Sequence, residues 1–330
     1  MNKKKIIIDC DPGIDDALAI MLACQSPELD ILGLTIVSGN INGKQCAENA
    51  LNILDVMGRT DIPVYLGKTT PLKRKMVLAK ETHGEDGLGG YTFKRKNNIT
   101  FKNGGVAFLA KTLMQEDDVS ILPIGPLTNI ATLVQNYPEA AKKIKEIVLM
   151  GGTFKSHGNT SPVAEFNFWA DPDAADIVFK ELDCPITMVG LDVTREVVLT
   201  PNYIEMLHQF NDPLADVIVG ITRFYTDFHW KQERTLGCII NDPLAIAYFI
   251  NRDLCKGKYY YVDIIKEGKA IGMSMVDEAN FFKKKPNCKV LTKVDAASFM
   301  EMLLTRLFKE HADDIQHVIY HPKYGYQNAY

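Results

Sequence analysis

Four aspartates lie within eight positions near the start of the chain, in the stretch "IIIDCDPGIDDALAI", residues 6–20. They are Asp9, Asp11, Asp15 and Asp16, and Ile, Ala and Leu surround them. Two ionised carboxylates about 4 Å apart repel each other by roughly 4 kcal/mol at an effective dielectric constant near 20. Burying an unpaired carboxylate costs several kcal/mol more. The cluster therefore needs protons, basic partners or a metal ion.

A divalent cation is the counter-charge that the neighbouring sequence favours. No Lys or Arg lies between residues 6 and 43, and protons would neutralise carboxylates only at acid pH. Oxygen ligands suit hard cations such as Ca²⁺ and Mg²⁺. A helix start would explain one capping Asp but not four. A phosphatase of the haloacid dehalogenase type also begins with a strand and D-x-D, but here Pro-Gly-Ile-Asp-Asp follows, and no later D-D pair with a supporting Lys is evident.

A second polar set lies in "GNTSPVAEFNFWADPDAA", residues 158–175. Asn159, Glu165 and Asn167 could hydrogen-bond a polyhydroxylated ligand, while the aromatic residues beside them, Phe166 among them, supply apolar walls. The letters "EFNFW" also alternate, which is equally compatible with a half-buried strand whose polar side chains face water. The residues leave both interpretations open.

The stretch "NDPLAIAYFI", residues 241–250, predicts a helix. Asp242 is expected as its N-cap and Pro243 as its first residue. The spacing leaves open whether Asp242 also binds a metal ion.

Short β-branched runs alternate with helical patterns along the chain, which predicts an α/β fold with an open, mostly parallel sheet covered by helices on both faces. Strands are expected near residues 5–8, 31–37, 119–124, 146–150, 185–190 and 259–265. Helices are expected near residues 15–24, 43–57, 104–116, 127–135, 171–181, 201–209, 214–229 and 242–250. We expect residues 1–330 to form a single domain.

Several apolar runs end in Gly and a hydrogen-bonding side chain, for example "LTIVSGN", "ILPIGPLTN", "IVLMGGT" and "ITMVGLDVT". Ligands of open α/β sheets bind beyond the carboxyl ends of the strands, so these endings are where a site is expected. Residues 67–103 show no clear period, and a loop of that length in a compact domain tends to be functional or mobile.

The composition is that of a globular protein: of 330 residues, 46% are hydrophobic and 24% charged, and the net charge is −4. This balance argues against nucleic-acid binding. The apolar run after "MNKKK" breaks at Asp9, so we expect neither a signal peptide nor a membrane span. Seven cysteines without C-x-x-C spacing suggest reduced thiols in a cytoplasm. Cys10 is expected as a buried small hydrophobe, and the basic stretch "NFFKKKP" as a solvated loop.

Seven motifs occur in the order seen in the inosine-uridine nucleoside hydrolase family, which the chain resembles from residue 6 to about residue 250. They are D-x-D-P-G-x-D-D, "VSGN", "HGEDGLGG", "PIGPLTNIA", "MGG", "GNTSPVAEFNFWADPDAA" and "NDPLA". The resemblance implies a Rossmann-like core and a calcium-dependent enzyme that hydrolyses the N-glycosidic bond of ribonucleosides to ribose and a free base. It also implies a homodimer or homotetramer whose partner is a small nucleoside, with no membrane partner.

The resemblance further implies a role for each matching residue. Asp11, Asp16 and Asp242 would bind Ca²⁺ through carboxylates and Ile124 through its carbonyl. Asp15, Asn40 and Asn167 would hold the secondary hydroxyls of ribose, and Asn159 and Glu165 the 5′-hydroxyl. His83 would lie near the base, and Asp9 behind the metal ligands. Asp11 would act as general base on a water bound to Ca²⁺.

The chain departs from the family at Asn241, where many members have a histidine that protonates the leaving purine. Asn has no titratable proton, so this proton must come from His83, Tyr225, His229 or water. Tyr225 and His229 lie on a segment that covers the base in the family, although both could equally be packing residues. The departure also favours a rival reading, a Ca²⁺-dependent nucleoside- or ribose-binding protein without turnover.

Overall fold

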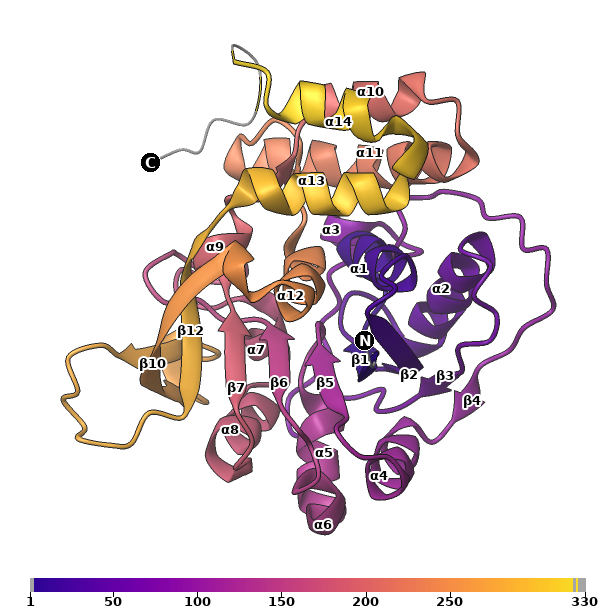
Figure 1. Ribbon diagram of the computed structural model, residues 1–330. Helices are drawn as coiled ribbons and strands as arrows, with labels where there is room; N and C mark the ends of the chain where they lie inside the picture. The colour runs from indigo at the N-terminus through magenta and orange to yellow at the C-terminus, as the bar shows by residue number, and fades with distance from the viewer. Residues whose placement is uncertain (1–2, 323–324, 326–330) are drawn as a thin grey trace.

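A ten-stranded sheet forms the centre of the computed structural model, which describes residues 3–322 and 325 (Figure 1). Neighbouring strands are parallel from β12 to β4, and β10 and β11 extend the sheet with antiparallel pairs. Their spatial order is β11 (Ser274–Asp277), β10 (Cys255–Ile264), β12 (Cys288–Val294), β7 (Ile186–Val189), β6 (Ile147–Met150), β5 (Ser120–Pro123), β1 (Lys4–Cys10), β2 (Leu29–Ile36), β3 (Val64–Leu66) and β4 (Lys102–Asn103). The pair β8 (Val198–Leu199) and β9 (Cys238–Ile239) forms a separate antiparallel ribbon.

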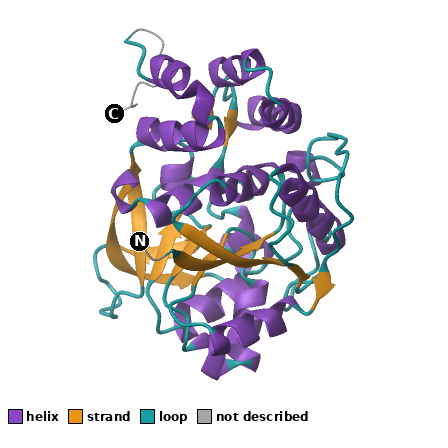
Figure 2. Cartoon of the chain, turned by 45° about the vertical axis from the view of Figure 1, so that its right-hand side comes forward, coloured by secondary structure: helices purple, strands orange, loops and turns teal. Residues whose placement is uncertain are grey.

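Helices cover both faces of the sheet, as the alternation of runs predicts (Figures 1 and 2). Successive side chains of a strand point to opposite faces, so Ile6 and Ile8 belong to one buried cluster and Ile7 to the other. The first cluster includes α1 (Ile14–Cys24), α2 (Gly43–Val56), α12 (Asn241–Ile250) and α13 (Ala296–Leu307). The second includes α4 (Gly105–Gln115), α5 (Thr128–Asn136), α6 (Pro138–Ala141) and α8 (Pro172–Glu181).

The remaining helices lie around the carboxyl ends of the strands or above the first helical layer. They are α3 (Lys80–His83), α7 (Phe166–Ala170), α9 (Leu191–Thr194), α10 (Pro201–Gln209), α11 (Pro213–Glu233) and α14 (Ala312–Ile319), with 3-10 turns at Arg252–Leu254, Gly268–Ala270 and Lys309–His311. No helix in residues 3–322 combines the length and apolar composition needed to cross a bilayer.

The predicted fold class is confirmed, with corrections at particular elements. The predicted strand at 259–265 exists as β10 but is antiparallel to both neighbours. The possible strand in "EFNFW" is wrong, because Glu165 caps a helix there: its carboxylate accepts hydrogen bonds from the backbone N–H groups of Asn167 and Phe168. Asp242 is not the N-cap of α12, since the helix begins at Asn241 and its first turn has no side-chain cap.

The strand order creates a crevice beside β1. The chain leaves β1 toward β2 on one side, and β5 pairs with β1 on the other. The loops that follow β1 and β5 therefore separate at the carboxyl end of the sheet, which is where open α/β folds bind ligands. Asp11 follows β1 and Ile124 follows β5, so both residues stand at this switch point.

Candidate active site

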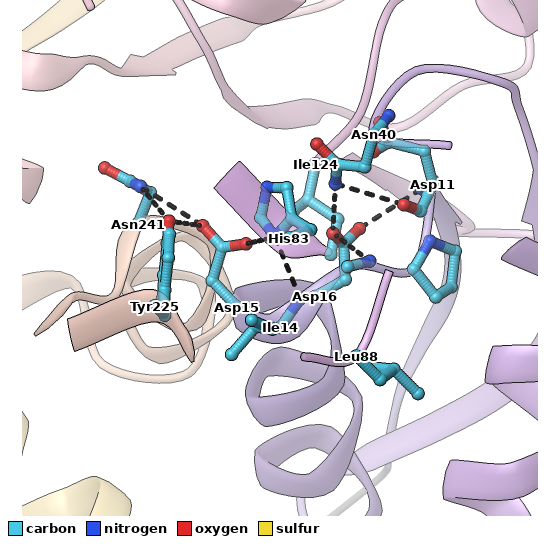
Figure 3. Close-up of polar contacts among 12 residues, drawn as sticks. Asp11, Ile14, Asp15, Asp16, Asn40, His83, Leu88, Ile124, Tyr225 and Asn241 are labelled. Atoms are coloured by element: carbon cyan, nitrogen blue, oxygen red, sulfur yellow. Dashed lines mark hydrogen bonds and ion pairs between the residues drawn. The ribbon is translucent and has the colours of Figure 1, made fainter. Parts of the chain in front are cut away.

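Asp16 closes the turn between β1 and α1. Its Oδ1 accepts a hydrogen bond from the backbone N–H of Asp11 at 3.1 Å, and its Oδ2 accepts one from Gly13 at 3.0 Å (Figure 3). Oδ2 of Asp11 accepts from the backbone N–H of Asn40 at 2.7 Å. A Cβ on Gly13 would lie 2.7 Å from His83 Nδ1 and from Asn40 Nδ2, so only glycine leaves room for both side chains.

Three carboxylates meet at the base of the pocket: Asp15, Asp16 and Asp242 each place an oxygen within 4.8 Å of the others. Burial, reinforced by the charge of Asp15, raises the pKa of Asp16 to about 7. Burial and the neighbouring acids also raise the pKa of Asp11 and of Asp242 well above the usual range. Among the described residues, no positive charge therefore compensates the ionised forms of these carboxylates.

Asp11 and Asp9 each have a buried carboxylate oxygen without a partner among the described residues, and Asp11 is the one beside the cluster. Its side chain is fully buried, and its Oδ1 has no hydrogen-bond partner among the described residues. A buried acceptor without a partner costs free energy that a bound cation would recover. The all-oxygen donor set therefore fits a hard divalent cation.

Asp15 lies closer to the metal-type cluster than the resemblance implies. The resemblance implies that Asp15 binds ribose, yet its carboxylate belongs to the group of three oxygens, whereas Asp11 does not. Asp15 and Asp242 line the pocket, while Asp11 and Asp16 lie beneath it with no exposed surface. Asp9 lies deeper still: its Oδ1 accepts from Thr35 Oγ1 at 2.5 Å and from Asn129 Nδ2 at 2.8 Å.

Two buried amides border the cluster. Asn40 Nδ2 donates to the carbonyl of Asp11 at 3.1 Å and to Asp16 Oδ2 at 2.9 Å. Asn167 Nδ2 donates to the carbonyls of Ile124 at 3.0 Å and Met150 at 3.2 Å. Both side chains are thus held in place: Asn40 by the residue after β1 and by α1, and Asn167 by the residue after β5 and the last residue of β6.

Glu165 is 2% exposed and accepts three backbone N–H groups: Asn167 at 2.8 Å, Gly152 at 2.9 Å and Phe168 at 3.3 Å. Burial outweighs these donors and raises its pKa to about 7. Asn159 Oδ1 accepts from the N–H of Phe166 at 3.0 Å. These bonds fold residues 158–167 into one compact pocket wall.

Aromatic rings and Asn241 form the opposite wall. The ring centroid of Tyr225 lies 5.2 Å from that of His83 and 4.4 Å from that of His229. His83 Nδ1 accepts from the N–H of Ile14 at 3.2 Å, and burial lowers the pKa of His83 to about 4. His229 Nδ1 lies 2.9 Å from the Tyr225 carbonyl, which can only accept, so this nitrogen carries the proton. Burial lowers the pKa of His229 as well, and both imidazoles are neutral at pH 7.

The pocket brings together most residues that the sequence predicts. Those that line it are Asp15, Asn40, His83, Ile124, Asn159, Glu165, Phe166, Asn167, Tyr225, His229, Asn241 and Asp242. The sequence interpretation missed other polar and aromatic lining residues, among them Thr82, Thr160, Arg195, Phe228, Gln232 and Glu233. Helical spacing from His229 could have indicated Gln232 and Glu233, whereas Arg195 has no such signal.

Comparison with known proteins decides the family. The model of the inosine-uridine preferring nucleoside hydrolases matches residues 6–301. The chain belongs to this family. The pyrimidine-specific ribonucleoside hydrolase RihA of Photobacterium profundum is 40% identical over 310 residues, which are 92% of this chain and 98% of that protein. RihB of Escherichia coli O9:H4, also named as pyrimidine-specific, is 38% identical over 301 residues, 91% of this chain and 95% of its own.

A solved structure shows the same fold. The purine-preferring ribonucleoside hydrolase from Gardnerella vaginalis superposes with a TM-score of 0.86 and 31% identity, covering 95% of this chain and 99% of the other. This nucleoside hydrolase therefore cleaves the N-glycosidic bond of ribonucleosides, and the predicted resemblance is confirmed. The haloacid dehalogenase alternative is wrong.

Proposed function

We propose that this nucleoside hydrolase holds Ca²⁺ through the carboxylates of Asp11, Asp16 and Asp242 and the carbonyl of Ile124. The buried Oδ1 of Asp11, which has no protein partner in the described chain, supports this assignment. The carboxylate oxygens of Asp16 and Asp242, which lie close together beside Asp15, support the assignment of these two residues. When bound, Ca²⁺ lowers the pKa of a coordinated water and orients sugar hydroxyls.

We assign Asp11 as the general base. Its Oδ2 is held by the N–H of Asn40, which fixes the carboxylate beside the proposed cation, where it could accept a proton from a coordinated water. Positive charge grows on the ribose ring as the glycosidic bond stretches. The carboxylates of Asp15, Asp16 and Asp242 stabilise that charge more than they stabilise the neutral substrate. This preferential binding of the transition state lowers the activation barrier.

The remaining assignments follow the two pocket walls. Asp15, Asn40 and Asn167 would hold the secondary hydroxyls of ribose, and Asn159 and Glu165 the 5′-hydroxyl. His83, Phe166, Tyr225 and His229 would surround the base. All of these side chains line one pocket, which supports grouping them in one substrate site.

The family match over residues 6–301 carries this proposal. Its test is an assay for released reducing sugar with uridine, cytidine and inosine, run with Ca²⁺ and after chelation. The relatives include pyrimidine-specific and purine-preferring hydrolases, so both base classes belong in the panel. Calorimetric binding of a nucleoside with no sugar released from any of the three would instead support the rival, a binding protein without turnover.

We also propose a cytoplasmic, single-domain chain that forms a homodimer or homotetramer. All seven cysteines are free thiols, and one sheet extends from residue 4 to residue 294, which supports the first two statements. Light scattering on the purified protein tests the third, and a monomer at micromolar concentration would contradict it.

A further inference from the structure

The short helix α9 holds the loop that leads into the Asn159 wall. Asp192, its second residue, accepts three successive backbone N–H groups, from Phe154 at 2.6 Å, Lys155 at 2.7 Å and Ser156 at 3.0 Å. Arg195 follows three positions later, so the two side chains lie on the same side of the helical turn. Asp192 therefore accepts hydrogen bonds from the N–H groups of this loop, and Arg195 is placed to donate hydrogen bonds to its carbonyl and hydroxyl oxygens.

Arg195 holds the next part of the loop. Its Nη1 donates to the hydroxyl of Ser156 at 2.5 Å and to the carbonyl of His157, and its Nη2 donates to the carbonyl of Gly158 at 3.2 Å. Its side chain is only 15% exposed. Such a set of bonds needs the planar fork of a guanidinium and cannot be reproduced by an ammonium group.

The same guanidinium reaches across the pocket to α11. Nη2 of Arg195 also donates to Glu233 Oε1 at 2.9 Å. Glu233 lies one helical turn beyond His229, which is on the wall assigned to the base. Gly158, on the other side, directly precedes Asn159. Arg195 therefore connects the wall assigned to the 5′-hydroxyl with the wall assigned to the base.

The loop beyond Gly158 has little freedom to adjust. A Cβ on Gly158 would lie 2.2 Å from the carbonyl oxygen of Ser161 and 2.3 Å from that of Ala164. Its N–H donates to the carbonyl of Pro162 at 3.1 Å. Because this turn is tightly packed, a shift of Gly158 moves Asn159 with it, and Ala164 connects the turn directly to Glu165.

We propose that Arg195 is a positioning residue that sets the place of residues 158–165 relative to α11, and thereby the recognition of the substrate's 5′-hydroxyl. Four of its five N–H groups are bonded to protein atoms, so it acts through the two walls rather than on the reacting atoms. The inference rests on the proposed function, which assigns Asn159 and Glu165 to that hydroxyl.

The test compares uridine with 5′-deoxyuridine in Arg195→Met, Arg195→Lys and Glu233→Gln variants. The 5′-deoxy substrate already lacks the contact, so only uridine should respond. We expect Arg195→Met to lower kcat/KM for uridine by about 10-fold or more, the scale of one charge-assisted hydrogen bond, and to leave 5′-deoxyuridine within about two-fold. Arg195→Lys should fall between this variant and the wild type. Glu233→Gln, which keeps an acceptor oxygen, should have the smallest effect on kcat/KM for uridine.

Arg223→Met is the matched control, because Arg223 lies on α11 but pairs in solvent with Asp227 and is 76% exposed. This variant should change kcat/KM for neither uridine nor 5′-deoxyuridine. An equal loss on both substrates, or an unchanged rate for uridine in variants that unfold within a few degrees of the wild type, would overturn the inference. If Arg195→Met does not fold, the inference is tested in Arg195→Lys by the same comparison of kcat/KM for uridine with kcat/KM for 5′-deoxyuridine.

A failure of the proposed function would look different. The wild type would then cleave neither nucleoside, and calorimetric Kd values would replace kcat/KM. A uridine Kd that rises in Arg195→Met while that of 5′-deoxyuridine does not would still support the positioning role. Equal changes in both Kd values would overturn it.

Discussion

The hydroxyl of Tyr225 donates its proton to Oδ2 of Asp15 at a distance of 3.1 Å, and Nδ2 of Asn241 donates to the same oxygen at 3.1 Å. A carboxylate only accepts hydrogen bonds, so it fixes both groups: the tyrosine proton points at Asp15, and the amide turns its nitrogen inward (Figure 3). Burial raises the pKa of Tyr225 well above its ordinary value. Neither residue therefore offers a departing base an easily released proton.

We therefore predict fast cleavage of p-nitrophenyl riboside and slow cleavage of inosine. Nitrophenolate leaves as a stable anion, whereas a purine needs a proton. General acid catalysis is typically worth about 10²–10⁴-fold, so inosine should lag by about 10²-fold or more. Steady-state kcat values for the two substrates at pH 7 test this expectation.

Variants identify the source of any proton that does reach the purine. If a residue of α11 supplies this proton, inosine will be cleaved about as fast as p-nitrophenyl riboside. His229→Ala or Tyr225→Phe will then lower the rate for inosine and leave the rate for the nitrophenyl substrate unchanged. Asn241→His should raise the inosine rate if the missing imidazole is the limitation. Equal rates on both substrates, unchanged in all three variants, would contradict both accounts.

Metal removal should abolish turnover and lower stability together. A ligand that binds only the folded protein adds about 2.7 kcal/mol at 100 times its Kd. We therefore expect chelation to lower the thermal midpoint and Ca²⁺ to restore it along with activity. Asp11→Ala should lose both effects, whereas Asp61→Ala, on the exposed surface, should keep them. Active protein without a bound divalent ion in elemental analysis would contradict the assignment.

Deoxynucleosides should be very poor substrates. Asp15, Asn40 and Asn167 are at most 6% exposed, and polar groups so buried are left unpaired when a hydroxyl is missing. Sites of this kind reject such analogues by as much as about 10⁴–10⁵-fold. Comparable kcat/KM values for uridine and 2′-deoxyuridine would show that the ribose contacts are wrongly assigned.

Asp55 should hold the long loop at residues 67–103 in a pH-dependent manner. Its carboxylate accepts from Lys96 N at 2.7 Å, Asn97 N at 3.0 Å and Asn97 Nδ2 at 2.7 Å. Burial opposes ionisation, but these three donors outweigh it and lower the pKa of Asp55 below its unfolded value of 3.8. The stabilisation is therefore fully present above about pH 4 and is lost as the pH falls through the native pKa.

Limited proteolysis measures this effect. Asp55→Asn should expose the basic sites at Lys94, Arg95 and Lys96 to trypsin at pH 7, with a loss of about 1–2 kcal/mol of local stability. Asp61→Asn, at a solvent-exposed pair with Arg59, is the control and should be cut like the wild type. Wild-type cleavage of this loop by an acid-active protease should increase as the pH falls below about 4. Equal cleavage of both variants would rule out the role of Asp55.

The sequence predicted the chemistry of the site better than its scaffold. The acid motif needs only local spacing, and Asp11, Asp15 and Asp16 all lie where a strand, a turn and a helix place them. The strands at 64–66 and 102–103 have two or three residues and owe their pairing to neighbours distant in sequence. The helix at 166–170 depends on the Glu165 cap, which overrides the alternating pattern. The sequence does not predict a role for Arg195, because its hydrogen bonds depend on the tertiary packing of α9 against α11.

The distance along the chain between partners in the site also constrains how the protein is made. Asp15 and Asn241 are 226 positions apart, and Asp242 follows directly. At ribosomal speeds of about 5–20 residues per second, the first acids wait roughly 10–45 s for the last one to be synthesised. Closing so long a loop costs entropy before any contact rewards it. Cation capture is thus a late event in biogenesis, and a nascent chain that ends before residue 242 carries only part of the proposed ligand set.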